Sequence, residues 1–361
     1  MADIRTSSFN RSDRIILGGS AAAVVLAGAT RYLGGGSVLA FVCSALAVTL
    51  LAALVGRSVE QLGDRFGPGA TGVLQSALGN LPELFIALFA LKAGLVVVVQ
   101  AALIGSILAN LLLVLGLCFV VGGLKHGTQK LGSERARGIT VLMLLSVSAL
   151  LLPSMASYVH APAAAHEGRL SLIVSIILLL LFCLTLPASL KRGSSRLSTE
   201  MTSHQDAPRW SLVLAVSLLA VAALTAAFVS DWFVHALEPA MAALHISDAF
   251  AGLVIVAIAG NAIENVVGMQ LAARNQSEYA FSVVVNSPLQ IALVLAPLLV
   301  ILSQLFGLAP LTLVFTPMLV VSVTVAVLIT AFITVDGESN WIEGIALIAV
   351  YAIIATAFWW G

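Results

Sequence analysis

Charged residues are scarce in this sequence. Asp, Glu, Lys and Arg make up 9% of its 361 residues, whereas 60% of the residues are apolar. Soluble domains carry roughly 25% charged residues, so a soluble domain with a polar shell is excluded. The 17 lysines and arginines are also too few and too dispersed to form a surface for nucleic acid. The composition therefore predicts a polytopic membrane protein whose main partner is the lipid bilayer.

Cysteines and catalytic motifs are scarce as well. Cys43, Cys118 and Cys183 are far apart and lie in apolar segments, so they lack the spacing of a disulfide framework or a metal site. The sequence also lacks the paired aspartates, the His-Glu-x-x-His helix and the Ser/His pair that intramembrane proteases use. We therefore expect a protein that is not an enzyme and has no cofactor.

Long apolar runs, by contrast, are abundant. A hydrocarbon core of about 30 Å needs about 20 apolar residues in a helix. Asp231, Glu238 and Asp248 fall between two of these runs, in an expected outer connection. The pattern predicts an all-α fold of about eleven transmembrane helices, at roughly 15–33, 37–56, 71–92, 96–123, 138–159, 170–190, 210–230, 249–272, 281–306, 310–335 and 341–360.

The first run has an alternative interpretation. Arg5, Arg11 and Arg14 precede it, and it ends near Ala27-Gly28-Ala29, which is typical of a signal-peptide cleavage site. The run is long for a signal peptide, however, and the distribution of charge favours keeping it as a helix.

Basic residues are distributed unevenly over the connections. With the N-terminus in the cytoplasm, 14 of the 17 basic residues lie in cytoplasmic segments, and only Arg31, Lys92 and Arg169 lie outside. This bias follows the positive-inside rule and predicts a C-terminus on the outer side. Short connections without an organelle-targeting segment favour the plasma membrane of a bacterium, and the oligomeric state stays open.

One short motif occurs twice inside apolar runs. Gly79–Glu83 reads GNLPE and Gly260–Glu264 reads GNAIE, so the two glutamates lie 181 residues apart. An ionisable side chain in hydrocarbon costs at least ~3 kcal/mol on insertion scales, which marks a functional site. Pro82 and the two glycines, Gly79 and Gly260, weaken the helices, and a broken helix frees backbone groups at membrane depth only where they line a cavity.

The repeat also defines the organisation of the chain. Its two copies lie five crossings apart, so their helices run in opposite directions. Inverted repeats of this kind are typical of secondary transporters, which bind substrate where discontinuous helices meet. We predict a tail with the first helix, a first five-helix repeat, a cytoplasmic linker and a second five-helix repeat, at 1–35, 36–190, 191–209 and 210–361.

Oxygen-bearing side chains accompany both glutamates. Asn80 and Asn261 precede them, and Asn265 follows the second. Carboxylate, amide and backbone oxygens are the ligands that Ca²⁺ prefers. Glu83 and Glu264 would neutralise a divalent metal ion, and with the cation gone they could take up protons.

A second pair of polar stretches follows one run later in each half. Ser106 and Asn110 lie four residues apart and share a helix face. Asn286 and Gln290 have the same spacing, with Ser287 beside them. We predict that all five line the cation site. Close helix packing at small residues is the alternative for the two serines.

These stretches resemble a known family. Residues 79–110 are similar to the first alpha repeat of the calcium/proton exchangers of the calcium/cation antiporter superfamily, and residues 260–297 to the second. The segment Asp336–Gly344 is similar to the family's last loop and helix. The resemblance implies export of Ca²⁺ in exchange for H⁺ by alternating access, with Glu83 and Glu264 as shared ligands.

One departure from the family keeps alternatives open. The family usually has histidine after the second glutamate, where this sequence has Asn265. An imidazole can take up a proton near neutral pH and an amide cannot. Exchange of Ca²⁺ for Na⁺, or proton antiport of Mn²⁺, Na⁺ or K⁺, is therefore the alternative within transport. A passive channel is a further class, although channels usually place rings of ligands between symmetric subunits.

Overall fold

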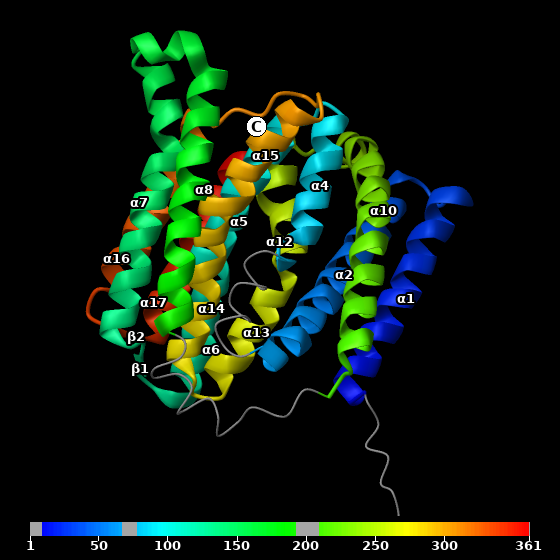
Figure 1. Cartoon of the computed structure of the whole chain (residues 1–361), viewed down its shortest axis with the longest axis horizontal. Helices are drawn as coiled ribbons and strands as arrows, with labels where there is room; N and C mark the ends of the chain where they lie inside the picture. The colour runs from blue at the N-terminus through cyan, green and yellow to red at the C-terminus, as the bar shows by residue number, and fades with distance from the viewer. Residues whose placement is uncertain (1–8, 67–77, 193–208, 361) are drawn as a thin grey trace, which may run out of the picture. The chain divides into compact units, whose positions relative to one another are not determined.

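The protein is an all-α polytopic membrane protein (Figure 1). The computed structural model describes residues 9–66, 78–192 and 209–360. In this part of the chain nine helices are long and apolar enough to cross a bilayer, or ten when the bent pair within Asp248–Ala273 counts as one span. These are ten of the eleven predicted spans. The remaining one, 71–92, is described only from Leu78 onward.

The helices form two compact units, and each unit draws on both halves of the sequence. Unit 1 comprises Met1–Ile86 with Cys183–Ala243, and unit 2 comprises Ala87–Phe182 with Leu244–Gly361. The predicted repeats group residues by similarity of sequence, whereas these units group residues by contacts in space. The two divisions can therefore have different boundaries. α4 (Leu81–Lys92) and α8 (Glu167–Arg192) run through the boundaries between units.

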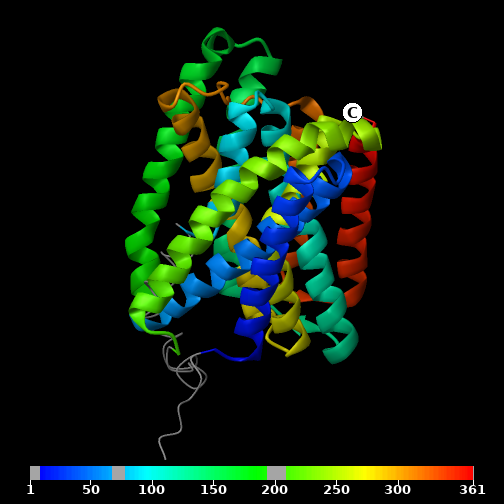
Figure 2. The ribbon, with the colours of Figure 1, turned by 90° about the vertical axis from the view of Figure 1, so that its right-hand side faces the viewer.

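Unit 1 is built mainly from three long helices, α1 (Arg11–Tyr32), α2 (Ser37–Phe66) and α10 (Leu212–Leu244). α1 lies beside α10 in both views (Figures 1 and 2), and Tyr32 meets the ring of Trp232 edge-on at 5.9 Å. α2 contacts α10 through Phe41 and Phe233, whose rings stack at 5.1 Å. Aromatic pairs of this kind add to the burial of apolar surface that holds the three helices together.

α10 continues well past the predicted end at residue 230. It has 33 residues and is therefore about 50 Å long, more than the hydrocarbon core requires. Asp231 and Glu238 accordingly lie on the helix and not in a loop, which corrects the expected outer connection. The physical reason is that residues 231–244 contain no glycine and are rich in alanine and leucine, so nothing but Pro239 opposes the helix.

Unit 2 contains most of the remaining elements. In chain order they are α5 (Val96–Leu108), η1 (Ala109–Val114), α6 (Leu115–His126), β1 (Gln129–Lys130), α7 (Ser133–Tyr158), η2 (Pro162–His166), α11 (Asp248–Phe250), η4 (Ala251–Val256), α12 (Ala257–Gly260), α13 (Ala262–Ala273), α14 (Ser277–Gln290), η5 (Ile291–Leu295), α15 (Ala296–Leu305), α16 (Pro317–Thr334), β2 (Glu338–Ser339) and α17 (Trp341–Trp359). The segments η1, η4 and η5 are π-helical turns within longer spans.

Glycines let two pairs of spans touch backbone to backbone in unit 2. A Cβ atom on Gly105 of α5 would overlap the carbonyl oxygen of Leu253, and one on Gly252 of η4 would overlap that of Val98. A Cβ on Gly116 of α6 would likewise lie 2.8 Å from the carbonyl oxygen of Gly344 in α17. Small residues at such crossings are how membrane helices approach closely. The crossing of α5 and η4 fixes the fourth span beside the eighth.

An extended segment between α15 and α16 is held by side chains instead of by a partner strand. Gln100 of α5 donates to the carbonyls of Thr312 and Val314, at 3.1 and 2.9 Å. Leu313 is fully buried, and its amide and carbonyl bond the hydroxyls of Ser171 and Ser154. Irregular backbone is tolerated inside a membrane protein only when its polar groups are satisfied in this way.

A short antiparallel ribbon is the exception to the all-α prediction. β1 pairs with β2, with Gln129 opposite Ser339 and Lys130 opposite Glu338. The Gln129 side chain is 2% exposed, and its amide donates to the carbonyl of Phe119 at 3.0 Å. The ribbon ties the connection after α6 to the connection after α16.

Candidate cation site

In both copies of the repeated motif a half-helix begins two residues after the glycine. The helix resumes with α4 at Leu81 and with α13 at Ala262, and each of these half-helices has 12 residues. The carbonyl of Asn80 accepts the N–H of Leu84 at 2.9 Å, and that of Asn261 accepts the N–H of Asn265 at 3.2 Å. The eighth span is bent by 59° at its break. The break of the eighth span follows Gly260, as the sequence predicts, and in the third span Gly79 and Asn80 form a turn before α4.

Pro82 has a different role from the one that its sequence position first suggests. It is the second residue of α4, where the N–H that proline lacks would have no partner within the helix. Pro82 therefore starts the second half of the span, and the chain turns at Gly79 and Asn80.

The two glutamates occupy equivalent positions on their half-helices. Glu83 is the third residue of α4, and Glu264 is the third residue of α13. The first turn of a helix has free N–H groups and the positive end of the helix dipole, which favour a carboxylate. The Glu83 side chain is 4% exposed and belongs to unit 1. Glu264 belongs to unit 2, and its side chain lies outside the described part of the structure.

Three uncharged polar side chains converge within unit 2. The amide nitrogen of Asn110, in η1, lies 2.7 Å from Oδ1 of Asn261 and 3.3 Å from Oγ of Ser287. Ser287, in α14, also lies 3.2 Å from Oδ1 of Asn261. Asn110 and Asn261 are both about 1% exposed or less. The fourth, eighth and ninth spans therefore meet at one hydrogen-bonded cluster, which we call the amide cluster (Asn110, Asn261 and Ser287).

The side-chain amide nitrogens of the amide cluster donate hydrogen bonds, whereas one of its acceptors has no partner among the described residues. Asn110 also donates to the carbonyl of Ser106 at 2.9 Å, and Asn261 donates to the carbonyl of Ala257 at 2.8 Å. Oδ1 of Asn110 is buried and has no hydrogen-bond partner among the described residues, and the same holds for Oδ1 of Asn265. A buried acceptor without a partner costs about 1–3 kcal/mol, which a bound cation would relieve.

Two π-helical turns occur at equivalent positions of the two halves. Glu83 and Glu264, and likewise Ser106 and Ser287, lie 181 residues apart. With the same offset, η5 (Ile291–Leu295) corresponds to residues within η1 (Ala109–Val114). In each turn a backbone N–H bonds the carbonyl five residues earlier, so one carbonyl loses its usual helical partner. At the start of η1 the carbonyl of Ser106 accepts both the N–H of Ala109 and the side-chain amide of Asn110.

The remaining predicted site residues are not members of the amide cluster. Asn286 donates to Oγ of Ser282 on its own helix, at 3.3 Å. Ser106 is fully buried one turn before Asn110, and Gln290 is the last residue of α14. Asn80 lies with Glu83 in unit 1, and the other uncharged candidates lie in unit 2. The hydrogen bonds from Asn110 to the other spans had no signal in the sequence.

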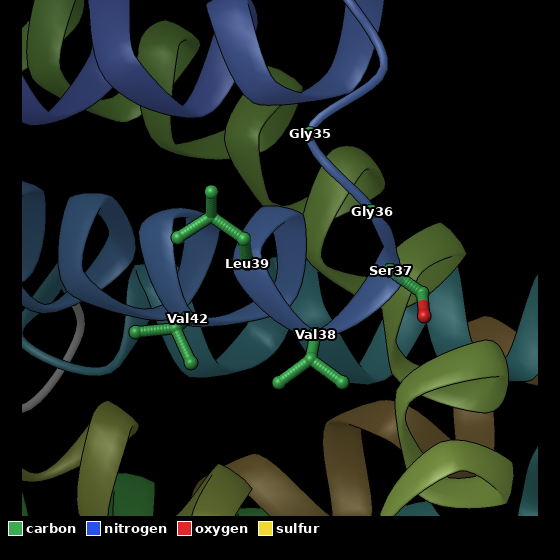
Figure 3. Close-up of a pocket in the computed structure, with 6 residues that line it drawn as sticks. All are labelled: Gly35, Gly36, Ser37, Val38, Leu39 and Val42. Carbon is green, nitrogen blue, oxygen red and sulfur yellow. The ribbon is translucent and has the colours of Figure 1, made fainter.

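Among the described residues no three His, Cys, Asp or Glu side chains come close enough together to hold a metal ion. A hollow of about 530 Å³ in unit 1 is lined by Gly35, Gly36, Ser37, Val38, Leu39 and Val42 (Figure 3). Its lining has one hydroxyl and no carboxylate, so it lacks the ligands of a cation site.

Known proteins match the chain over nearly its whole length. A family described as sodium/calcium exchanger protein matches residues 36–191 and 214–360. The Ca(2+)/H(+) antiporter ChaA of Bacillus subtilis is 37% identical over 326 residues, covering 89% of this chain and 92% of that protein. The Ca(2+)/H(+) antiporter of Aphanothece halophytica is 36% identical over 342 residues, covering 91% of each.

The fold has a counterpart among solved structures. The structure of native YfkE superposes with a TM-score of 0.82 at 35% sequence identity, covering 96% of this chain and 99% of that one. The chain belongs to the sodium/calcium exchanger protein family, and within it to the calcium/proton exchangers.

Proposed function

We propose that the protein is a secondary active transporter that exports Ca²⁺ from the cytoplasm in exchange for H⁺ by alternating access. The observation that carries the proposal is the match to curated Ca(2+)/H(+) antiporters over about nine-tenths of the chain. The amide cluster supports it independently, because its free acceptor is an uncharged hard ligand in the same fold.

The mechanism follows from competition for two carboxylates. Glu83 and Glu264 carry the charge that binds either Ca²⁺ or protons, and each begins a half-helix whose free N–H groups stabilise the anion. The uncharged oxygens of Asn110 and Asn265, with Asn80, Asn261, Ser287 and their neighbours, complete the coordination. Ca²⁺ and protons are substrates of this site, and the scheme needs no cofactor and no catalytic residue.

The topology that the charges predict has a cytoplasmic N-terminus and an outer C-terminus in the plasma membrane of a bacterium. The ion gradients set the direction of transport, and a proton gradient directed inward drives Ca²⁺ outward through the exchange. Nothing in the scheme needs more than one chain, so assembly into a homo-oligomer would be separate from the exchange.

Transport by purified protein in proteoliposomes tests the function. A pH gradient imposed across the vesicle membrane should drive uptake of ⁴⁵Ca²⁺, and collapse of the gradient with a protonophore should stop it. A Na⁺ gradient of equal size should drive no uptake. Uptake driven by Na⁺ but not by the pH gradient would replace the proposal with Na⁺/Ca²⁺ exchange, and uptake without either gradient would indicate a channel.

Residue 265 is the position at which ion preference should respond. The amide oxygen of Asn265 is buried and has no partner among the described residues. Its loss in Asn265→Ala should lower the apparent Ca²⁺ affinity about 5-fold, which corresponds to about 1 kcal/mol. Asn265→His replaces an amide that cannot titrate by an imidazole that can, so the pH dependence of transport should change. Initial rates at several pH values, with Mn²⁺ as competitor, measure both effects. Two variants indistinguishable from the wild type would remove residue 265 from the site.

A further inference from the structure

A buried tryptophan far along the sequence belongs to a core cluster against which the residue just before the first copy of the repeated motif packs. Trp210, just before α10, is 1% exposed and lies in a core cluster of unit 1. Phe9 meets its ring edge-on at 5.6 Å, and Leu78 packs against the same cluster. We call this the Trp210 cluster, and its buried members are Leu54, Val55, Val59, Leu62, Trp210, Ala215 and Ala222.

The backbone of Trp210 is pinned to the last turns of α2. Oε1 of Gln61 accepts the N–H groups of Arg209 and Trp210, at 3.0 and 3.2 Å. The guanidinium of Arg65 donates to the carbonyl of Trp210. Gln61 is itself 3% exposed, so these bonds lie in a low-dielectric environment where they are hard to replace by water. Trp210 therefore has one fixed position relative to α2.

Leu78 connects this fixed point to the motif. It immediately precedes Gly79 and Asn80, where the third span turns, and Glu83 follows five residues after it. An unbroken helix would position Glu83 through its own hydrogen bonds. Because the chain turns at Gly79 and Asn80, packing must help to position it there, and Leu78, the one described residue between 67 and the turn, packs against the Trp210 cluster.

We propose that Trp210 is a positioning residue for the Gly79–Glu83 motif, and that it acts through Leu78. The inference rests on the proposed function, because it assigns Trp210 to the geometry of the cation site. Trp210 touches neither cation nor proton. Its ring supplies volume to the cluster against which Leu78 packs, and on this proposal loss of the ring lets the turn before α4 move.

The state of the indole N–H allows the effect of ring volume to be distinguished from the effect of a hydrogen bond. Nε1 of Trp210 is buried without a partner among the described residues, so its N–H contributes no bond that holds the cluster together. The volume of the ring is then what matters. Phenylalanine at this position keeps most of that volume and removes the unpaired donor, and it should preserve the position of Leu78.

The test compares variants by their apparent KM for Ca²⁺, their maximal rate and their Tm in proteoliposomes or detergent. Trp210→Ala should raise the apparent KM at least about 5-fold, a shift of about 1 kcal/mol, and Trp210→Phe should stay within about 2-fold of the wild type. Phe233→Ala is the matched control, because Phe233 is a fully buried aromatic residue of the same unit that stacks on Phe41 and is not part of the Trp210 cluster. It should lower the Tm as Trp210→Ala does and leave the KM unchanged.

Each outcome decides one proposal. An unchanged KM in Trp210→Ala, or an equal rise in Phe233→Ala, overturns the positioning role while wild-type exchange stands. Should Trp210→Ala fail to fold, Leu78→Ala is the second variant, and it must show the same rise in KM. Wild-type protein that takes up no ⁴⁵Ca²⁺ in response to a pH gradient contradicts the proposed function itself.

Discussion

Glu83→Gln and Glu264→Gln should each abolish Ca²⁺ uptake driven by a pH gradient. Glutamine keeps the size of the side chain and one oxygen, but it removes a negative charge and a group that can carry a proton. Leaving a buried divalent ion with half of its counter-charge costs about 3 kcal/mol or more, as removal of one partner from a buried ion pair does. The rate at limiting Ca²⁺ should fall about 100-fold or more.

The two variants should remain folded. The Glu83 side chain is 4% exposed, and a neutral amide is cheaper to bury than a carboxylate, so the Tm should not fall. Glu60→Gln is the matched control, because Glu60 lies on a spanning helix but is 52% exposed and pairs with Arg57. It should transport as the wild type does. Near-normal uptake by either site variant would exclude that carboxylate from the mechanism.

The breaks in the two spans could be predicted from the sequence because their causes are local. Gly79 and Gly260 have low helix propensity whatever surrounds them, and a carboxylate among apolar residues is conspicuous in any membrane helix. The common face of Ser106 and Asn110 also follows from helix periodicity alone. The prediction of a cation site therefore depends on local features of the sequence and not on contacts between spans.

The amide cluster could not be predicted, because its bonds join different spans. Nothing in the sequence near Asn110 indicates that its amide donates to Asn261, 151 residues away. The π-helical turn at Ala109–Val114 has no signature either, since the residues ANLLLV would form an ordinary α-helix equally well. It is the packing of three spans that selects these arrangements.

The boundary of the linker illustrates the same limit. The polar segment 191–209 is conspicuous by composition, but the residue after it, Trp210, is a buried anchor of unit 1. A tryptophan at the edge of a polar stretch is equally typical of a membrane interface. Only the contacts with Gln61 and with the surrounding cluster distinguish the two roles.

Asn110→Leu should be nearly as damaging as loss of a carboxylate. Leucine has a similar shape, but it removes the buried acceptor Oδ1 and leaves Oδ1 of Asn261 and the carbonyl of Ser106 without the Asn110 donor. Oδ1 of Asn261 keeps the hydroxyl of Ser287 as a donor, and the carbonyl of Ser106 keeps the N–H of Ala109. The lost buried hydrogen bonds and the missing ligand together cost about 2–3 kcal/mol. The apparent Ca²⁺ affinity should fall about 30- to 100-fold, measured from initial ⁴⁵Ca²⁺ uptake over a range of Ca²⁺ concentrations.

Two further variants separate loss of a ligand from loss of packing. Asn110→Asp keeps the oxygen, and its protonated form can still donate to Asn261, so it should retain more affinity than Asn110→Leu. Gln129→Leu is the matched control, because Gln129 is also a buried amide of unit 2 but bonds the carbonyl of Phe119 and no residue of the amide cluster. It should cost stability without changing the affinity. Equal losses in Asn110→Leu and Gln129→Leu would mean that Asn110 holds the helices together, and the free oxygen of Asn110 would then have no part in binding the ion.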